Sequence, residues 1–353
     1  MSARSIRRAI GAAATALAAS LLAASPAKAV DDAAILAKRP PKQLSAFGFF
    51  ADAAAQIPAE SVLPFAPATP LFTDFAEKRR FVYMPEGKSA NYDADETFRF
   101  PVGAALIKTF AYPDDSADGL HLVETRVLLH QDSGWQAWAY VWNEDQSEAE
   151  LNIIGTKIGM NIPLPDGGTK AITYAVPNKN QCKGCHAING DITPIGPKAR
   201  NLNHDYDYGS GAENQLARWV EAGMLTGVPE PDEAPSVPDW LDEAATLNSR
   251  ARAWLDINCA HCHRREGPAS NSGLFLTWNE TDQTAYGINK RPVAAGRGSG
   301  GLHFDILPGA PDKSILLYRV ESTEPGVMMP ELGRSLTDPR AVALLREWIA
   351  SLR

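Results

Sequence analysis

Two five-residue strings hold all four cysteines of the sequence and could do chemistry together with histidine. They read Cys182-Lys183-Gly184-Cys185-His186 and Cys259-Ala260-His261-Cys262-His263, so both have the form C-x-x-C-H. Two thiols at this spacing can each add to a vinyl group of haem, and the adjacent histidine is then held beneath the iron as a ligand. The spacing therefore predicts two covalently attached c-type haems. The predicted attachment and iron-binding residues are Cys182, Cys185 and His186 in the first string and Cys259, Cys262 and His263 in the second.

Cysteine pairs of this spacing also occur in four-cysteine zinc sites and in thioredoxin-like redox sites. Zinc does not require a histidine directly after both pairs. A redox pair usually lies in a βαβ context, and the sequence around these strings lacks that pattern. No cysteine remains for a structural disulfide. The haem interpretation is the one that accounts for both histidines.

The first 29 residues have the features of a secretory signal peptide. Arg4, Arg7 and Arg8 precede a small-residue apolar run over 9–24, and Ala27-Lys28-Ala29 follows as a small-x-small cleavage pattern. The run is short and mostly alanine, too weak for a membrane span, and no later segment is long and apolar enough to be one. We therefore expect cleavage after Ala29 and a periplasmic location, which agrees with covalent haem attachment outside the cytoplasm.

Composition limits the class of protein. The chain has 353 residues, 44% apolar and 22% charged, which is ordinary usage for a soluble globular protein. Lysine and arginine number 34 against 42 aspartates and glutamates, a net charge of −8. This balance argues against a nucleic-acid partner, which would require a basic face. The length favours two or three domains and is ample for a core that needs no disulfides.

Short antiparallel strands are predicted between about residues 76 and 175. Four segments rich in β-branched and aromatic residues cover 81–84, 105–110, 122–129 and 135–142, with turn clusters at 113–116 and 165–168. In the last segment Trp138, Tyr140 and Trp142 share one face, and we interpret them as core packing rather than a binding cluster. The pattern indicates an antiparallel sheet or small sandwich.

Helices are predicted after Pro177. They cover 215–222, a segment capped by Asn248 or Ser249 that leads into Cys259, a short stretch near 314–321, and an amphipathic segment after Asp338-Pro339. The predicted fold class is α+β, with a β-rich (sandwich-like) N-terminal domain and two mostly α-helical, cytochrome c-like haem modules. The expected divisions are 1–29 signal peptide, 30–175 β-rich domain, 176–245 first haem module and 246–353 second haem module.

Six stretches carry a family resemblance. They are 70–75 (PLFTDF), 180–186 (NQCKGCH), 194–203 (PIGPKARNLN), 256–263 (DINCAHCH), 308–314 (PGAPDKS) and 328–333 (MMPELG). Over most of the mature chain, the sequence resembles an uncharacterised family of bacterial periplasmic di-haem c-type cytochromes with a β-rich N-terminal domain. The resemblance implies this architecture and brings no reaction or substrate. Genes of the family often neighbour one for a parallel β-helix protein, so the resemblance also implies such a partner.

The second module resembles a cytochrome c domain in its order of elements. A helix leads into Cys259, a short helix follows, then Met329-Pro330 and a closing helix. The resemblance implies that Met329 is the sixth iron ligand, with Met328 as a possible replacement and His303 next; the alternative is two core methionines. A thioether ligand would stabilise the reduced iron. The cations that flank the nearby Gly-rich loop would neutralise haem propionates or form a solvated cluster; they are Lys290, Arg291 and Arg297.

The first module is less regular. Gly196-Pro197 lies about where cytochromes c carry a Gly-Pro loop, and that resemblance implies that the Pro197 carbonyl accepts the proton of His186. The sixth ligand stays open. Met224 follows the helix over 215–222, where a cytochrome c methionine would come, and His204 is its main rival. Further candidates from the sheet region are Met84, Met160, His121 and His130, and an open position is the remaining alternative.

Three functions agree with these features. The first is electron transfer between the two haems and a periplasmic redox partner protein. The second is a di-haem peroxidase with one open haem, which the missing ligand of the first haem favours. The third is a redox sensor in which the β-rich domain docks a partner. We favour electron transfer, because the motif spacing and the large β-rich domain are unlike those of the known di-haem peroxidases.

Overall fold

The computed structural model describes residues 29–114, 119–230, 232–293 and 295–353. The predicted signal peptide falls on residues 1–29, and all of it except Ala29 lies outside the described residues. Within the described ranges, no helix combines the length and the apolar character that crossing a membrane would need.

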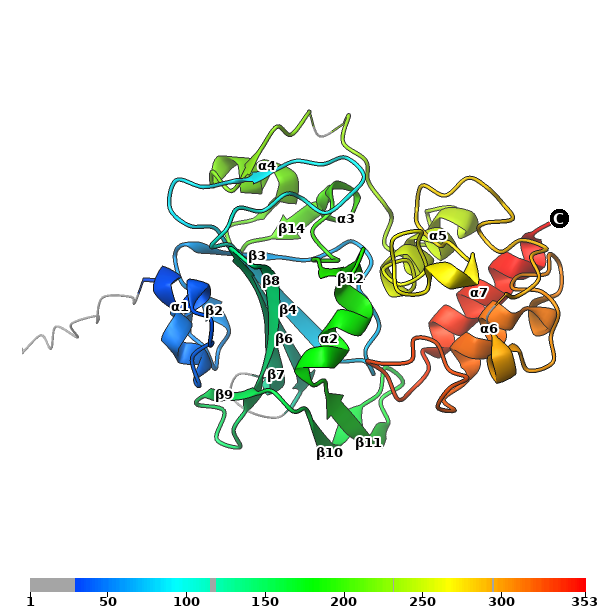
Figure 1. The fold of residues 1–353 in the computed structure, drawn as a ribbon, viewed down its shortest axis with the longest axis horizontal. Coiled ribbons are helices and arrows are strands. Elements are labelled where there is room, and N and C mark those ends of the chain that lie inside the picture. The colour runs from blue at the N-terminus through cyan, green and yellow to red at the C-terminus, as the bar shows by residue number, and fades with distance from the viewer. Residues whose placement is uncertain (1–28, 115–118, 231, 294) are drawn as a thin grey trace, which may run out of the picture.

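A six-stranded antiparallel sheet forms the centre of the molecule (Figure 1). Its strand order is β3-β4-β6-β7-β8-β9. The strands are β3 (Val62–Phe65), β4 (Glu77–Tyr83), β6 (Ala105–Pro113), β7 (Leu120–Gln131), β8 (Gly134–Trp142) and β9 (Ala149–Asn152). The four predicted strand segments are confirmed as parts of β4, β6, β7 and β8, although most of the observed strands are longer, because pairing extends them beyond their apolar stretches.

One face of the sheet is covered by the N-terminal segment. That segment contains α1 (Asp32–Leu36), a 3-10 turn (Leu44–Phe47) and the small pair β1 (Phe50–Asp52) and β2 (Ile57–Pro58). Phe47 packs edge-on against Tyr140, with ring centroids 5.9 Å apart. Trp138, Tyr140 and Trp142 all belong to this core, so the predicted packing is confirmed for Tyr140 and Trp142, whereas Trp138 also lines a cavity on the side of α2 (Lys179–His186).

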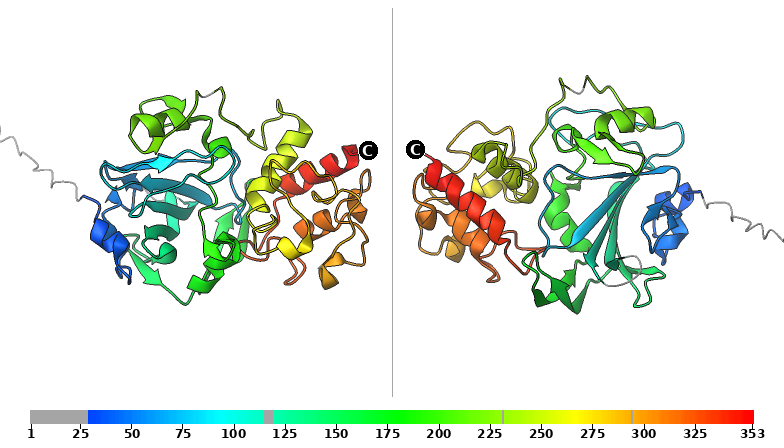
Figure 2. Two further views of the ribbon diagram at one scale, coloured as in Figure 1. Left: turned by 45° about the horizontal axis from the view of Figure 1, so that its top comes forward. Right: turned by 180° about the vertical axis from the view of Figure 1, so that it is seen from behind.

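The opposite face carries the chain that follows the sheet (Figure 2). The hairpin β10 (Thr156–Pro163) and β11 (Thr169–Val176) leads to α2 (Lys179–His186), which contains the first C-x-x-C-H string. A short ribbon, β12 (Ala187–Ile188) and β13 (Asp191–Ile192), follows and lies with α2 against β8.

Residues 199–226 also pack against the sheet, next to β3 and β4. This segment contains α3 (Ala199–Leu202), β14 (Asp205–Asp207), β15 (Ala212–Asn214), α4 (Gln215–Glu221) and β16 (Leu225–Thr226). β16 pairs in parallel with β5 (Ala90–Asn91), and Trp219 of α4 packs on Phe65 and Phe98. The predicted helix over 215–222 is confirmed as α4. The segment shares a core with the strands instead of forming one of its own.

The C-terminal segment lies beside this body, on the side of α2 (Figure 1). It contains α5 (Leu247–Asn258), α6 (Ile315–Glu321), α7 (Pro339–Ser351) and three 3-10 turns (Ser270–Ser272, Gly296–Ser299, Pro311–Lys313). Trp254 and Leu255 of α5 share a core with Leu345, Trp348 and Ile349 of α7. The three predicted helices are confirmed, but the cap of α5 is the Thr246 side chain, which accepts from the Ser249 amide, rather than Asn248 or Ser249.

The predicted fold class is wrong, because the chain lacks two mostly α-helical, cytochrome c-like modules. Strands account for 28% of the described residues and helices, 3-10 turns included, for 22%, and the seven α-helices of the described ranges are mostly short. In 176–245, small strand pairs separate short helices, and the segment is built onto the sheet. In 246–353, the Gly- and Pro-containing stretch between α5 and α6 folds as turns and loops.

Candidate functional site

The first motif, residues 182–186, is held in a helix by a reciprocal cap. The Asn178 side chain accepts from the Gln181 amide and the Gln181 side chain accepts from the Asn178 amide, both at 2.9 Å. This capping box satisfies two amides that a helix start leaves unpaired. Cys182 and Cys185 are three positions apart in α2, so they lie on one side of it.

His186, the last residue of α2, has a fixed orientation. Its Nδ1 donates to the Thr193 carbonyl oxygen at 2.9 Å, which leaves Nε2 as the nitrogen with a free lone pair. Burial lowers the pKa of His186 to about 4, so the ring is neutral at pH 7, the form that binds a metal. The resemblance implied Pro197 as the acceptor, and this is wrong, because the Nδ1 proton of His186 goes to Thr193. The Pro197 carbonyl accepts from the Phe98 amide at 3.1 Å instead.

A cavity of about 220 Å³ separates α2 from the sheet. Cys182, Cys185 and His186 line one wall of this first-motif cavity, and Arg80, Lys108 and Arg126 of the sheet line another. A second space of about 200 Å³ lies against the same histidine and cysteine.

The second motif, residues 259–263, forms the turn that follows α5. A buried ion pair places this helix: Arg200 of α3 donates to both carboxylate oxygens of Asp256 at 3.0 Å. The same carboxylate accepts from the Trp278 amide at 2.9 Å, on the loop after the motif. A paired, hydrogen-bonded carboxylate of this kind is costly to disrupt, because removing one partner leaves a buried charge.

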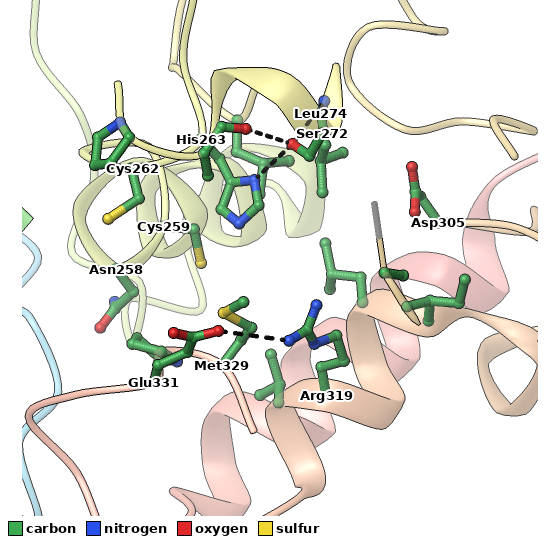
Figure 3. A pocket seen from close by; sticks show the side chains of 18 of the residues that line it. Asn258, Cys259, Cys262, His263, Ser272, Leu274, Asp305, Arg319, Met329 and Glu331 are labelled. Carbon is green, nitrogen blue, oxygen red and sulfur yellow. Dashed lines mark hydrogen bonds and ion pairs between the residues drawn. The ribbon is translucent and has the colours of Figure 1, made fainter. Parts of the chain in front are cut away.

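A larger cavity, of about 550 Å³, opens at the second motif (Figure 3). Cys259 and His263 point into it from the turn after α5, and Met329 faces them from the other side (Figure 3). Its volume lies in the range of cofactor sites. Burial lowers the pKa of His263 to about 4, so this ring is also neutral at pH 7. The second motif and Met329, predicted to work together, thus line one cavity, while Met328 lines neither cavity.

The loop that carries Met329 is clamped at several points. Arg334 donates to the Met329 carbonyl from Nη2 at 2.7 Å and to the Ser322 carbonyl at 2.9 Å. Asp74, which precedes β4, accepts from the amides of Ser335 and Leu336 at 2.8 Å each. One side of the second-motif cavity is therefore anchored to the chain that enters the central sheet.

Charged groups at the second-motif cavity differ from those expected. Lys290 pairs with Asp305 at 2.8 Å, while Arg297 is largely exposed and lies 3.6 Å from Glu324. Neither they nor Arg291 line the cavity, so the three residues are not gathered around it. The cation that does line it is Arg319, whose Nε donates to the Val327 carbonyl at 2.8 Å.

The two cavities share a wall. Residues that line both are Cys185, His261, Pro330 and Leu332. The Cys262 thiol lies 3.6 Å from the Gly184 carbonyl oxygen, so the second cysteine of one motif touches the other motif. The Cys185 and Cys262 sulfurs and a His261 ring nitrogen all lie within 4.8 Å of one another. The neighbouring Cys262 thiol and, more weakly, His261 lower the pKa of Cys185, although burial opposes them.

The other predicted ligands are not brought to either cavity. Met224 lies in the core between α4 and the sheet, where it packs with Phe98 and Trp219. His204 bonds to the Ala66 carbonyl through Nε2 at 3.0 Å. Met84 is buried in the same core as Met224, and His130 stacks on Trp135. The remaining candidates that line neither cavity are Met160, His121 and His303.

Sequence reasoning missed the cavity residues of the sheet and the shared wall. Lys108 and Arg126 are charged residues in the middle of predicted strands, which is a signal that one face of the sheet is polar at that point. His261 could have been singled out as a third histidine inside the second motif. The shared wall has no local signal, because it depends on how distant segments pack.

Comparison with known proteins adds no relative to this description: no family model, curated protein or solved structure matches the chain.

Proposed function

We propose that the chain is an exported di-haem c-type cytochrome that transfers electrons between two covalently bound haems and a periplasmic redox partner protein. When bound, haem supplies a one-electron couple, and the protein tunes it through the ligands and the surroundings. The resemblance of the sequence adds a parallel β-helix protein as a candidate partner.

The residues of both cavities fit this cofactor. Each cavity is lined by the two thiols of its own motif and by the histidine that follows them, which burial keeps neutral at pH 7. Met329 supplies a soft thioether across the second-motif cavity from His263. Arg80 and Arg319 each place a guanidinium at one cavity, and a guanidinium pairs well with a carboxylate such as a propionate.

The shared wall is the observation that favours electron transfer. Electron tunnelling falls steeply with distance, so two haems serve a transfer path only if they lie close together. Attachment at Cys185 and at Cys262 would bring their edges together, because these sulfurs and His261 lie within 4.8 Å. Two haems that act independently would not need to lie this close together.

Zinc is the competing ligand for the same residues. Cys185, His261 and Cys262 form a set of soft donors, but a structural zinc site takes four ligands, and the described chain gathers three there. His186 and His263, which follow the two cysteine pairs, line the two cavities and do not join this cluster. Haem accounts for both histidines and zinc does not.

The first experiment measures covalent haem in protein exported from a host with a c-type haem maturation system. We expect two haems per chain by pyridine haemochrome assay and a haem-stained band after denaturing electrophoresis. Cys182→Ala together with Cys185→Ala should halve the haem content, and Cys259→Ala together with Cys262→Ala should halve it too. Zinc in place of iron in the purified wild type, or unchanged haem content in either variant, would contradict the proposal.

The second experiment separates electron transfer from peroxidase activity. The reduced protein is mixed with an oxidised small cytochrome and, separately, with hydrogen peroxide. Rapid oxidation of both haems by the cytochrome, with slow reaction toward peroxide, is the expected result. Fast turnover of peroxide would instead support the peroxidase alternative.

A further inference from the structure

The first-motif cavity has no methionine in its wall, and its sheet side carries a row of three cations. Arg80 of β4 pairs directly with Lys108 of β6, and Lys108 pairs directly with Arg126 of β7. Residues that oppose each other in antiparallel strands point to the same face. All three residues line the cavity, on the wall formed by the sheet, while His186 lines it from α2.

Lys108 differs from its two neighbours in its contacts. Arg126 is bound to the buried carboxylate of Glu124, which also accepts from the Tyr174 hydroxyl. Arg80 donates to the Lys78 carbonyl at 3.1 Å. Within the described ranges, the recorded contact of the Lys108 amine is with the ring of Phe110, at 4.6 Å from its centroid, and no hydrogen bond or ion pair holds it.

Three neighbouring positive charges repel one another, which favours the loss of a proton from one of them. Lys108 is the group of the three that can lose its proton. A guanidinium keeps its proton at neutral pH, even for Arg80, where burial lowers the pKa to about 10. Burial, together with the charges of Arg80 and Arg126, lowers the pKa of Lys108 well below its usual range. The buried carboxylate of Glu124 opposes this shift only in part. A lowered pKa favours the neutral amine, whose lone pair is the form that lysines use as bases or nucleophiles.

Among the residues that line this cavity, two side chains other than His186 can offer a nitrogen lone pair: Lys108 and His261. His261 sits beside the sulfurs of Cys185 and Cys262, which would be bonded to the edge of the porphyrin and not to its centre. Lys108 comes from the sheet wall, whereas His186 comes from α2. We propose that Lys108 is the sixth ligand of the haem bound at the first motif, opposite His186; this inference rests on the proposed function.

The test compares two Lys108 variants with a matched control in the loaded full-length protein. Lys108→Arg replaces the amine with a guanidinium, which stays protonated and cannot bind iron, and Lys108→Ala removes the amine. Lys78→Arg is the control, because Lys78 lies on β4 and does not line the cavity. Spin state is read from the visible spectrum and electron paramagnetic resonance, and ligand access from carbon monoxide binding to the reduced protein.

We expect two low-spin haems in the wild type and in Lys78→Arg. In both Lys108 variants one of the two haems should become high-spin or change its ligand signature, and carbon monoxide should bind about one haem per chain. Added butylamine should restore the low-spin spectrum in Lys108→Ala, where space for it has been opened. Unchanged spectra in both variants, or one high-spin haem already in the wild type, would overturn this inference. Absence of haem from the wild type would overturn the proposed function as well, so the two failures are distinguishable.

Discussion

At the scale of single residues, the two histidines that follow the cysteine pairs are buried and neutral. Burial lowers the pKa of His186 and of His263 to about 4, so both rings keep a lone pair at neutral pH. The orientation of His186 is fixed by the Thr193 carbonyl at 2.9 Å, whereas the Nδ1 of His263 lies 3.4 Å from the Ser272 hydroxyl. The first ring is therefore held by the stronger hydrogen bond, since strength declines with distance.

Met329 carries the first prediction. Met329→Ala should abolish the near-infrared charge-transfer band of a Met–Fe(III) haem and lower the potential of that haem, because the iron loses a soft ligand that favours the reduced state. The measurement is a near-infrared spectrum with a redox titration.

Met328 is the control for this substitution. It adjoins Met329 without lining the cavity, so Met328→Ala alone should leave the band in place. If the double variant Met328→Ala, Met329→Ala also kept the band, neither sulfur would be an iron ligand.

At the scale of elements, α2 depends on its cap. The helix has eight residues, and such a short helix is marginal without additional support. Asn178→Ala removes one half of the capping box and should lower the free energy of unfolding by about 1 kcal/mol. Chemical denaturation measures this loss, and Asn178→Ser is the matched control, since serine also caps well. An equal loss in both variants would mean that the cap is not the source of the effect.

Strands were more predictable than the position of the first motif. The segments 105–110 and 122–129 show their strand character locally, through β-branched and aromatic residues, and the sheet confirms them. The helix α2 was missed although Asn178-x-x-Gln181 is a capping-box signature. Met224 was predicted to be an iron ligand because it follows a helix, but its side chain is buried in the core next to Trp219.

The cation row could not be read from the sequence, because it depends on register. Arg80, Lys108 and Arg126 become neighbours only when β4, β6 and β7 pair in one alignment, and a shift by one residue would turn each side chain to the other face. The residues of the second-motif cavity were easier to predict. His263 belongs to the C-x-x-C-H string, and Met329 was predicted from the order of the helices and the Met-Pro pair.

At the scale of the whole molecule, ion pairs connect the strand region to the second motif. Arg264, which follows His263, binds Glu96 at 2.8 Å, and Lys198 lies 3.5 Å from the same carboxylate. Burial would raise the pKa of Glu96, but the hydrogen bond from Arg264 and the nearby cations lower it to about 2. A carboxylate whose pKa is lower in the folded state than in the unfolded state stabilises the fold at pH values above the unfolded-state pKa. This stabilisation is lost as the pH falls through the folded-state pKa.

The resulting prediction is a difference in acid stability. Between about pH 4.5 and pH 2, wild type should lose more stability than Glu96→Gln, which has no such charge to titrate. Denaturation curves across this range provide the comparison. Glu60→Gln, at an exposed glutamate without an ion pair in the described ranges, serves as the control and should follow the wild type. Parallel curves for wild type and Glu96→Gln would contradict the assignment.

Export is predicted to be required for loading. Deleting residues 2–29 should retain the chain in the cytoplasm and leave it free of covalent haem, whereas the full-length chain is loaded. Cell fractionation with haem staining distinguishes these outcomes. Covalent haem on the shortened chain would refute both the signal-peptide interpretation and the periplasmic location.

The wall common to both cavities has an electrostatic consequence for the proposed cytochrome. An electron placed at one site adds a negative charge beside the other, in surroundings that screen charge less than water does. Reduction of the first site therefore opposes reduction of the second, and the two midpoints of a redox titration belong to the pair rather than to either motif. Removing the haem of one motif should accordingly delete one midpoint and shift the other.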